Sequence, residues 1–368
     1  MTAPLPTDAI RGVITVIPCT DLSETLAYFR ERLGFRIELI SPADSPTTVV
    51  MWGHGAQVRL QKVDGAVDPG VLQLVCDDPQ VFGDDELVAP NGTRIELVPS
   101  DPPIEIPALQ QSVVVSTLRG NAQFGVGRAG MQYRDLVPDR QGGRFIASNI
   151  LIADGGLVPD YVHYHKVRFQ MIYVYRGWVR VIYEDQGESF VMQAGDCVLQ
   201  PPTIRHRVLE ASPGMQVIEV GCPAEHDTIA EHTITLPTGR ELPKREYGGQ
   251  LFVRHQAATS PWLPFRYDGF TFQDLGMGHA THGLAGARVI RADGGTHWPR
   301  SIIDNEFLFT FLLDGTAVLE IDGREAQSIE AGDSFVIPAD VAYSLSDVSS
   351  DATLLEVSLP ADLSPQPV

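Results

Sequence analysis

Short runs of alternating apolar and polar residues, separated by glycine and proline, dominate the chain. The runs are rich in Val, Ile, Tyr and Phe, and long apolar stripes at helical spacing are rare. Alternation with a period of two is typical of half-buried strands, and the 34 glycines and 27 prolines provide the turns between them. The pattern therefore predicts a mainly β protein.

One amphipathic helix interrupts this pattern near the N-terminus. In SETLAYFRERLG, Ser23 can cap the helix, Leu26 and Phe29 share one face, and Gly34 can end it. A strand-like run precedes the helix, and further strand-like runs follow it up to the proline-rich SDPPIEIPA that begins at Ser100. We therefore expect residues 1–104 to form a small α+β module with a strand, helix, three-strand order.

An internal repeat organises the rest of the chain. MQYRDL at Met131 reappears as FTFQDL at Phe270, and AGDCVLQPP at Ala194 reappears as AGDSFVIPA at Ala331; VIEVGCP and LLEVSLP close the two copies. Each copy has period-two strands that end in Gly or Pro turns, the pattern of a double-sheet antiparallel barrel. The repeat predicts two tandem barrels, residues 105–245 and 246–368.

The first copy carries histidines at a spacing that favours a metal site. His163 and His165 are two residues apart, so on a strand both side chains point into the same barrel. Gln170 follows on the same run, and GDCVLQPPTIRH places His206 later in the copy. Three imidazoles and one amide thus stand within otherwise apolar strands.

These residues resemble the two cupin motifs, as HxH(x)4Q(x)6G followed by G(x)5P(x)4H. In the cupin family, two His, a Glu and a third His bind one divalent metal, so the resemblance implies His163, His165, Gln170 and His206 as ligands in a bicupin. The departures are Gln170, where the family usually has Glu, and Thr203, where the second motif usually has Gly. Gln170 is therefore expected either to coordinate the metal or to hydrogen-bond a ligand or the substrate.

The second copy lacks the corresponding ligand types. The repeat aligns the four ligand positions with Ser301, Ile303, Leu308 and Tyr343. We expect this second barrel to hold no metal at the family site and to contribute packing and pocket shape.

The N-terminal module resembles the glyoxalase or vicinal oxygen chelate fold, through VITVIPCTDLSETLAYFRERLGFRIELIS and NGTRIELVP. That family takes His or Glu ligands from several strands. Ile14 stands where its first strand usually offers His, and only Glu96 occupies a familiar ligand place. An interaction or dimerisation module without a metal is therefore expected.

The resemblance to bicupins also implies a chemistry. Imidazole ligands suit Fe(II), Zn, Ni or Cu, with Mn also possible, and neutral ligands leave the metal its full charge, which favours an anionic chelating substrate. Bicupins with this arrangement include gentisate and quercetin types of dioxygenase, so we expect an Fe(II)-dependent dioxygenase that acts on a phenolic acid, enol or diketone. Arg168 shares strand parity with Gln170, and it or Arg205 could clamp the substrate anion. The alternatives are a non-redox isomerase or polyketide-cyclase-like enzyme, and a small-molecule-binding module.

Composition narrows the possible partners and compartment. There are 47 Asp and Glu against 27 Lys and Arg, a net charge of −20, which disfavours nucleic acid and anionic membranes. No apolar run approaches the roughly 20 residues of a membrane span. The four cysteines are scattered, as expected of free thiols, and FGVGRAG lacks the strand and helix of a dinucleotide site. We expect a cytoplasmic protein and a homodimer.

Overall fold

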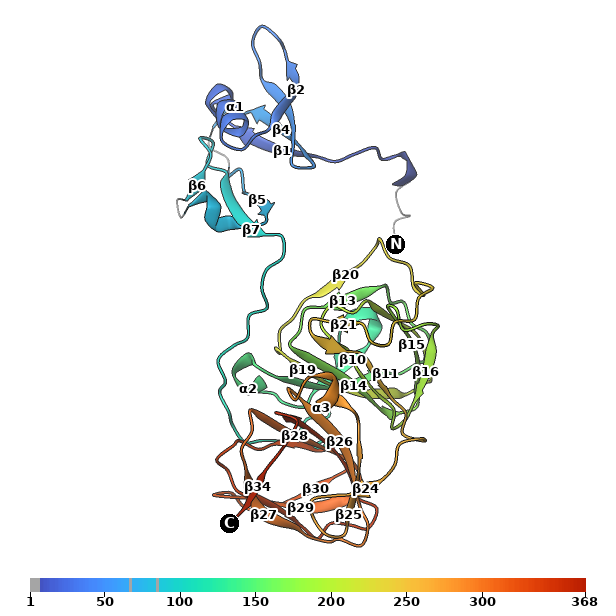
Figure 1. The fold of residues 1–368 in the computed structure, drawn as a ribbon. Coiled ribbons are helices and arrows are strands. Elements are labelled where there is room, and N and C mark those ends of the chain that lie inside the picture. The colour runs from blue at the N-terminus through green and yellow to red at the C-terminus, as the bar shows by residue number, and fades with distance from the viewer. Residues whose placement is uncertain (1–6, 66–67, 84–85) are drawn as a thin grey trace. The chain divides into compact units, whose positions relative to one another are not determined.

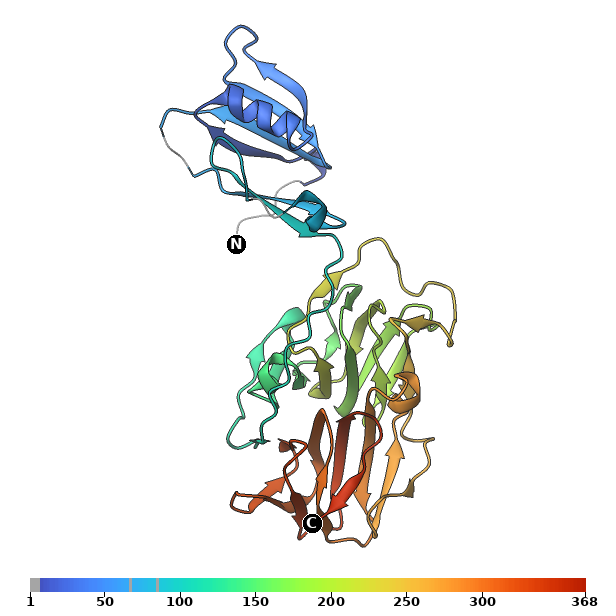
Figure 2. The ribbon, with the colours of Figure 1, turned by 60° about the vertical axis from the view of Figure 1, so that its left-hand side comes forward.

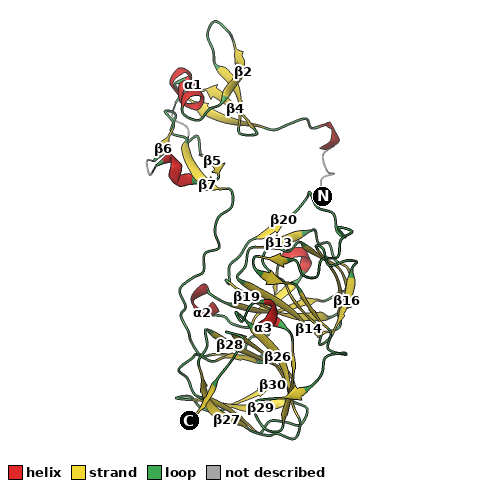
Figure 3. Ribbon diagram, in the orientation of Figure 1, coloured by secondary structure: helices red, strands yellow, loops and turns green. Residues whose placement is uncertain are grey.

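The computed structural model describes residues 7–65, 68–83 and 86–368, which form two compact units. The first comprises residues 1–103 and the second residues 104–368. Strands dominate both units, as Figure 3 shows, and the prediction of a mainly β protein is confirmed. None of the described helices is long and apolar enough to cross a membrane.

The first unit contains two sheets and one helix. Its elements are η1 (Thr7–Ala9), β1 (Ile14–Cys19), α1 (Leu22–Glu31), β2 (Arg36–Ser41), β3 (Thr48–Gly53), β4 (Ala56–Lys62), β5 (Val71–Cys76), η2 (Pro79–Phe82), β6 (Leu87–Val88) and β7 (Arg94–Pro99). One sheet has the order β1-β4-β3-β2, with β1 parallel to β4, and the other has the order β5-β7-β6. The strand, helix, three-strand order matches the sequence prediction, whereas the likeness to the vicinal oxygen chelate family stays a prediction.

Helix α1 begins earlier than predicted. Its cap is Asp21, whose side chain accepts a hydrogen bond from the backbone N–H of Glu24 at 2.9 Å. Ser23 lies inside the first turn instead. This shift lets Leu22 join Phe29 on the buried face of the helix, which explains why the carboxylate rather than the hydroxyl takes the cap.

The second unit consists of two barrels, each built from two facing sheets (Figures 1 and 2). In barrel 1, the larger sheet contains β9 (Gly125–Val126), β10 (Gln132–Asp135), β11 (Ile146–Ile152), β14 (Phe169–Arg176), β17 (Cys197–Leu199), β19 (Met215–Cys222) and β23 (Val253–His255). The smaller sheet contains β12 (Gly156–Leu157), β13 (His163–His165), β15 (Trp178–Tyr183), β16 (Phe190–Gln193), β18 (His206–Ala211) and β20 (Thr228–Ala230).

Barrel 2 repeats this topology. Its larger sheet contains β8 (Val114–Ser116), β24 (Leu263–Pro264), β25 (Phe270–Asp274), β26 (Gly286–Ala292), β28 (Phe307–Asp314), β31 (Ser334–Val336) and β33 (Thr353–Leu359). Its smaller sheet contains β27 (Trp298–Ile303), β29 (Thr316–Ile321), β30 (Gln327–Glu330), β32 (Tyr343–Ser346) and β34 (Pro365–Pro367). The remaining short elements are η3 (Arg128–Gly130), α2 (Arg140–Gly143), β21 (Glu246–Tyr247), β22 (Gln250–Leu251) and α3 (Met277–Ala280).

The two barrels exchange their outermost strands. β8 precedes barrel 1 in the chain but pairs with β31 of barrel 2, with Val115 opposite Phe335. β23 follows barrel 1 and pairs back onto its β17, with Arg254 opposite Val198. A boundary at residues 245 and 246 would therefore separate each exchanged strand from the sheet that it completes.

The largest core lies between the barrels, where their seven-stranded sheets pack back to back. Phe169 and Met171 on β14 face this core together with Phe307 and Phe309 of β28, and Phe145 stacks on Phe307 with ring centroids 4.2 Å apart. The intervening residues of β14 face the interior of barrel 1 instead. Both faces of the strand are thus buried, and Gln170 is aimed into its own barrel.

Candidate metal centre

Three histidines converge inside barrel 1. His163 and His165 lie on β13, and His206 lies on the neighbouring β18 directly opposite His163 in the register. One ring nitrogen from each lies within 4.8 Å of the others, and all three side chains are buried. Within the described residues, this is the one such cluster of three His, Cys, Asp or Glu ligand atoms.

Backbone carbonyls fix the tautomer of each ring. His163 Nδ1 lies 2.8 Å from the Tyr161 carbonyl oxygen, and His206 Nδ1 lies 2.9 Å from that of Ile204. His165 Nδ1 lies 3.1 Å from the Asp227 carbonyl oxygen. Because a carbonyl only accepts, each Nδ1 carries the proton, and each Nε2 keeps a lone pair for a metal.

The rings are held neutral as well as oriented. Burial, and to a smaller extent the neighbouring His226 and His163, lowers the pKa of His165 to about 3. Burial likewise lowers the pKa of His206 and, together with the charge of Arg128, that of His163. Neutral imidazole is the form that binds metal, so these residues fit a divalent ion at neutral pH.

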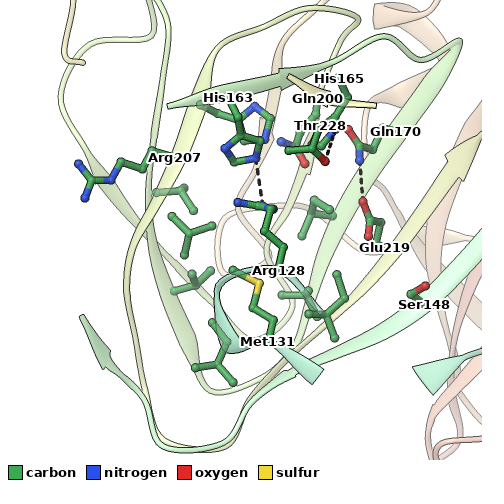
Figure 4. Close-up of a pocket in the computed structure, with 18 of the residues that line it drawn as sticks. Arg128, Met131, Ser148, His163, His165, Gln170, Gln200, Arg207, Glu219 and Thr228 are labelled. Atoms are coloured by element: carbon green, nitrogen blue, oxygen red, sulfur yellow. Dashed lines mark hydrogen bonds between the residues drawn. The ribbon is translucent and has the colours of Figure 1, made fainter. Parts of the chain in front are cut away.

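Gln170 faces the same interior and has a carboxylate partner. Its side-chain N–H donates to Glu219 Oε1 at 2.6 Å, from β14 to the adjacent β19, as Figure 4 shows. This bond turns the amide nitrogen toward Glu219 and leaves the amide oxygen of Gln170 as its possible metal donor. Glu219 belongs to neither cupin motif, although the repeated VIEV and LLEV segments place a glutamate there in both copies.

A guanidinium also points into the site. Arg128, which lies in FGVGRAG outside both cupin motifs, approaches His163 Nε2 with its Nη2 at 3.1 Å (Figure 4). Its Nη1 pairs with the fully buried Asp160, which also accepts a hydrogen bond from the Val208 N–H at 3.0 Å. No spacing motif in the sequence links these residues, because they come from separate segments.

Arg168 is not part of this pocket. Its guanidinium forms a bidentate pair with Glu306 of barrel 2, at 2.5 and 3.1 Å, and Arg144 joins the same carboxylate at 2.8 Å. Arg168 directly precedes β14, so strand parity does not fix its direction. Arg205, the other expected clamp, packs over the Tyr164 ring and approaches Glu231 at 3.6 Å.

The histidines stand at one end of a cavity of about 240 Å³. Eleven of its 24 lining residues are aliphatic or methionine: Met131, Ile146, Ile150, Ile152, Ile172, Val179, Val181, Met192, Val208, Met215 and Val217. Figure 4 shows Gln170, Gln200 and Glu219 near His163 and His165, with Arg128 pointing toward His163. The polar lining residues also include Ser148, Arg207 and His226. The cavity can therefore hold a small molecule that has a polar head group and an apolar body.

The expected ligand positions of barrel 2 lie in a filled interior. Ser301, Ile303, Leu308 and Tyr343 are buried, and Ser301 Oγ hydrogen-bonds the hydroxyl of Tyr267 at 3.0 Å. These four side chains therefore pack in the interior of barrel 2, where those of barrel 1 face a cavity.

Comparisons with known proteins agree with this geometry. The cupin domain family model matches residues 150–219, which include all three histidines. No curated protein matches the sequence. Two solved structures of oxalate decarboxylase from Bacillus subtilis, one a serine-to-alanine mutant and one analysed for its Mn(II) centres, each have a TM-score of 0.51. They are 12% and 13% identical in sequence, and each match covers 72% of this chain and 80% of that chain.

Residues 104–368 have a bicupin fold. At this identity the likeness concerns the fold alone. Within the bicupin fold, barrel 1 carries the three-histidine site that the cupin motifs imply, and the part of barrel 2 that corresponds to it does not.

Proposed function

We propose that barrel 1 is the active site of a metal-dependent cupin dioxygenase that acts on an anionic chelating small molecule. The class of substrate is a phenolic acid, an enol or a diketone, and each chain holds one divalent metal. The observation that carries this proposal is the convergence of three neutral imidazoles at the polar end of an apolar cavity.

His163, His165 and His206 would hold the metal, and the amide oxygen of Gln170 is available as a fourth donor. Imidazole ligands suit several metals, and the proposal favours Fe(II) because dioxygen chemistry needs a redox-active ion. A bound metal would supply Lewis acidity to the substrate's oxygen atoms and, as iron, electrons for the reduction of dioxygen.

Other groups of the protein can accept a proton from the substrate and exclude water from it. Glu219 lies beside Gln170 and is a carboxylate within the cavity, so it can accept a proton from a substrate hydroxyl. It also places one negative charge near four neutral donors, which the family motif alone does not indicate. The aliphatic walls keep water from the substrate body.

The lining also favours a substrate larger than oxalate. Oxalate has two carboxylates and no apolar part, so it leaves an aliphatic wall without a partner. An aromatic or alkyl-bearing acid buries its body against Met131, Ile172 and Met192 while its head reaches the histidines.

A non-redox metal enzyme is the second candidate. Two of the solved structures that share the fold are of a decarboxylase, and one is described by its Mn(II) centres. An isomerase or lyase would use the same chelate and the same proton acceptor, Glu219, without dioxygen.

The deciding experiment combines metal analysis with oxygen uptake. Protein purified with and without air is assayed for metal and then for oxygen consumption on a panel of phenolic acids and 1,3-dicarbonyl acids. Uptake that matches product supports the dioxygenase. Turnover without uptake supports the non-redox enzyme, and binding without turnover overturns both in favour of a binding module. His165→Ala serves as the metal-free control.

A further inference from the structure

The interior of barrel 2 contains a closed ion pair. Glu356 on β33 accepts two hydrogen bonds from Arg266, at 3.1 and 2.6 Å, and Arg288 on β26 approaches the same carboxylate at 3.4 Å. The Glu356 side chain is fully buried. Two guanidiniums thus contact one buried carboxylate inside a packed barrel.

The same positions in barrel 1 are arranged differently. Glu219 occupies on β19 the place of Glu356 on β33, but its cross-strand neighbour is Ser148, whereas Glu356 faces Arg288. Ser148 therefore stands in barrel 1 where Arg288 stands in barrel 2, and the Ser148 side chain lines the cavity.

Barrel 1 does have a second arginine, Arg128, but it does not bond Glu219. Arg128 stands three residues before the start of the MQYRDL segment, and Arg266 stands four residues before the matching FTFQDL segment. Arg266 reaches its glutamate, whereas Arg128 is held by Asp160 and points to His163. Glu219 hydrogen-bonds the amide of Gln170 instead.

In barrel 1 the cation and the carboxylate line the same cavity but bond to other groups: Arg128 to Asp160 and His163, and Glu219 to Gln170. The His163 lone pair that Arg128 contacts is the one that a metal would take, so a bound metal would free Nη2 of Arg128 while Asp160 still holds Nη1. This N–H of Arg128 could then donate to a substrate group bound next to the metal. A guanidinium in such a place binds an anionic oxygen.

We infer that the substrate head takes the place that the Arg266–Glu356 pair fills in barrel 2. One anionic oxygen of the substrate accepts from Arg128, and a hydroxyl of the substrate donates to Glu219. The substrate class is thus an acid that bears both a carboxylate and a hydroxyl on an apolar body. This inference rests on the proposed function only in that both place the substrate in barrel 1.

The test measures binding without turnover, on protein loaded with redox-inert Zn²⁺. The probes are 2-hydroxybenzoate, which carries both groups, benzoate, which has the carboxylate alone, and phenol, which has the hydroxyl alone. Calorimetry gives the dissociation constant of each probe. We expect 2-hydroxybenzoate to bind the parent protein more tightly than either single-group probe.

The two variants should separate the two halves of the site. Arg128→Met should weaken both acids by about tenfold or more and leave phenol unchanged, since a charge-assisted hydrogen bond is lost. Glu219→Gln should weaken phenol and 2-hydroxybenzoate but strengthen benzoate, because a nearby negative charge is removed. Arg128→Lys should keep part of the acid binding. Arg180→Met is the matched control, because this partly exposed arginine of β15 pairs with Glu210 and does not line the cavity.

Metal affinity provides an independent measurement. Arg128→Met should bind Zn²⁺ at least as tightly as the parent, because a competitor for the His163 lone pair is gone. Loss of metal, equal weakening of all three probes, or no binding by the parent would overturn the inference. If the probes follow the expected pattern but no acid is turned over, the proposed function fails and the binding site stands.

Discussion

At the residue scale, the environment of the histidines links metal binding to pH. The ordinary pKa of histidine would predict loss of metal below about pH 6. Burial lowers the pKa of His165 to about 3, so protons compete for its Nε2 only in stronger acid. Metal retention should thus extend to lower pH than the sequence alone indicates.

The same shift predicts how the metal-free protein responds to acid. Between pH 6.5 and about 3 the unfolded chain protonates His165 and the folded chain does not, so the free energy of unfolding falls as the pH falls. The slope is about 1.4 kcal/mol per pH unit for each such histidine. Urea unfolding of chelator-treated protein at pH 7, 6 and 5 measures it. His165→Gln should have a shallower slope, and an unchanged slope would contradict the lowered pKa.

Metal stoichiometry tests the three-histidine site directly. The parent should hold one divalent metal per chain, and His165→Ala should lose it because two imidazoles remain. Tyr343→Phe changes the position in barrel 2 that corresponds to His206 and should keep the metal. Elemental analysis after dialysis measures both. Two metals per chain, or metal loss in Tyr343→Phe, would show that the working barrel is assigned wrongly.

Gln170→Glu restores the usual cupin residue and has a second effect in this structure. The amide donor to Glu219 becomes a carboxylate at a contact of 2.6 Å, so the two acids would share a proton near neutral pH. The variant should retain metal at least as well as the parent, while turnover drops about tenfold because Glu219 is no longer a free acceptor. Turnover equal to that of the parent across the pH profile would contradict this role of Glu219.

At the element scale, the exchanged strands decide which parts of the chain can fold alone. A fragment of residues 105–245 would contain β8 without its partner β31, and its β17 would lack β23. An unpaired sheet edge favours aggregation. We expect this fragment to be insoluble or metal-free, whereas residues 104–368 should be soluble and bind one metal. Circular dichroism and metal analysis of the two fragments compare them, and a soluble metal-binding 105–245 fragment would contradict the prediction.

Local patterns in the sequence predicted the strands, the repeat and the histidines, because alternation and short spacing fix strand direction within one element. Arg128, Asp160 and Glu219 escaped prediction because their meeting depends on pairing between distant strands. Arg168 was misplaced for a related reason: it lies just before β14, where parity does not fix direction, and Glu306 of the other barrel attracts it. The strand exchange likewise leaves no local signal, since β8 and β23 look like ordinary strands.

At the scale of the whole molecule, a cluster of charges joins the two barrels. Partial burial alone would raise the pKa of Glu306, but its bonds to Arg168 and Arg144 outweigh that effect and lower it. The carboxylate therefore contributes stability above its usual pKa, and this contribution is lost as the pH falls through the lowered value.

Arg168→Met tests whether this residue stabilises the molecule or binds substrate. The variant leaves Glu306 with Arg144 alone and should lower the free energy of unfolding by about 2 kcal/mol, discounted for partial exposure of the pair. Because Arg168 does not line the cavity, binding of 2-hydroxybenzoate should stay the same. Denaturant unfolding and calorimetry measure the two effects, with Arg180→Met as control. Weaker probe binding at unchanged stability would restore Arg168 as the clamp.

The exchange of strands also sets an order of events during synthesis on the ribosome. β8, at Val114–Ser116, is the first strand of the second unit to leave the ribosome, yet its partner β31 ends only at Val336. Barrel 1 closes its larger sheet once β23 has been made, while β8 still waits with an open edge. The earliest strand of the second unit is therefore among the last of its strands to pair. The nascent chain carries this unpaired strand through most of its translation.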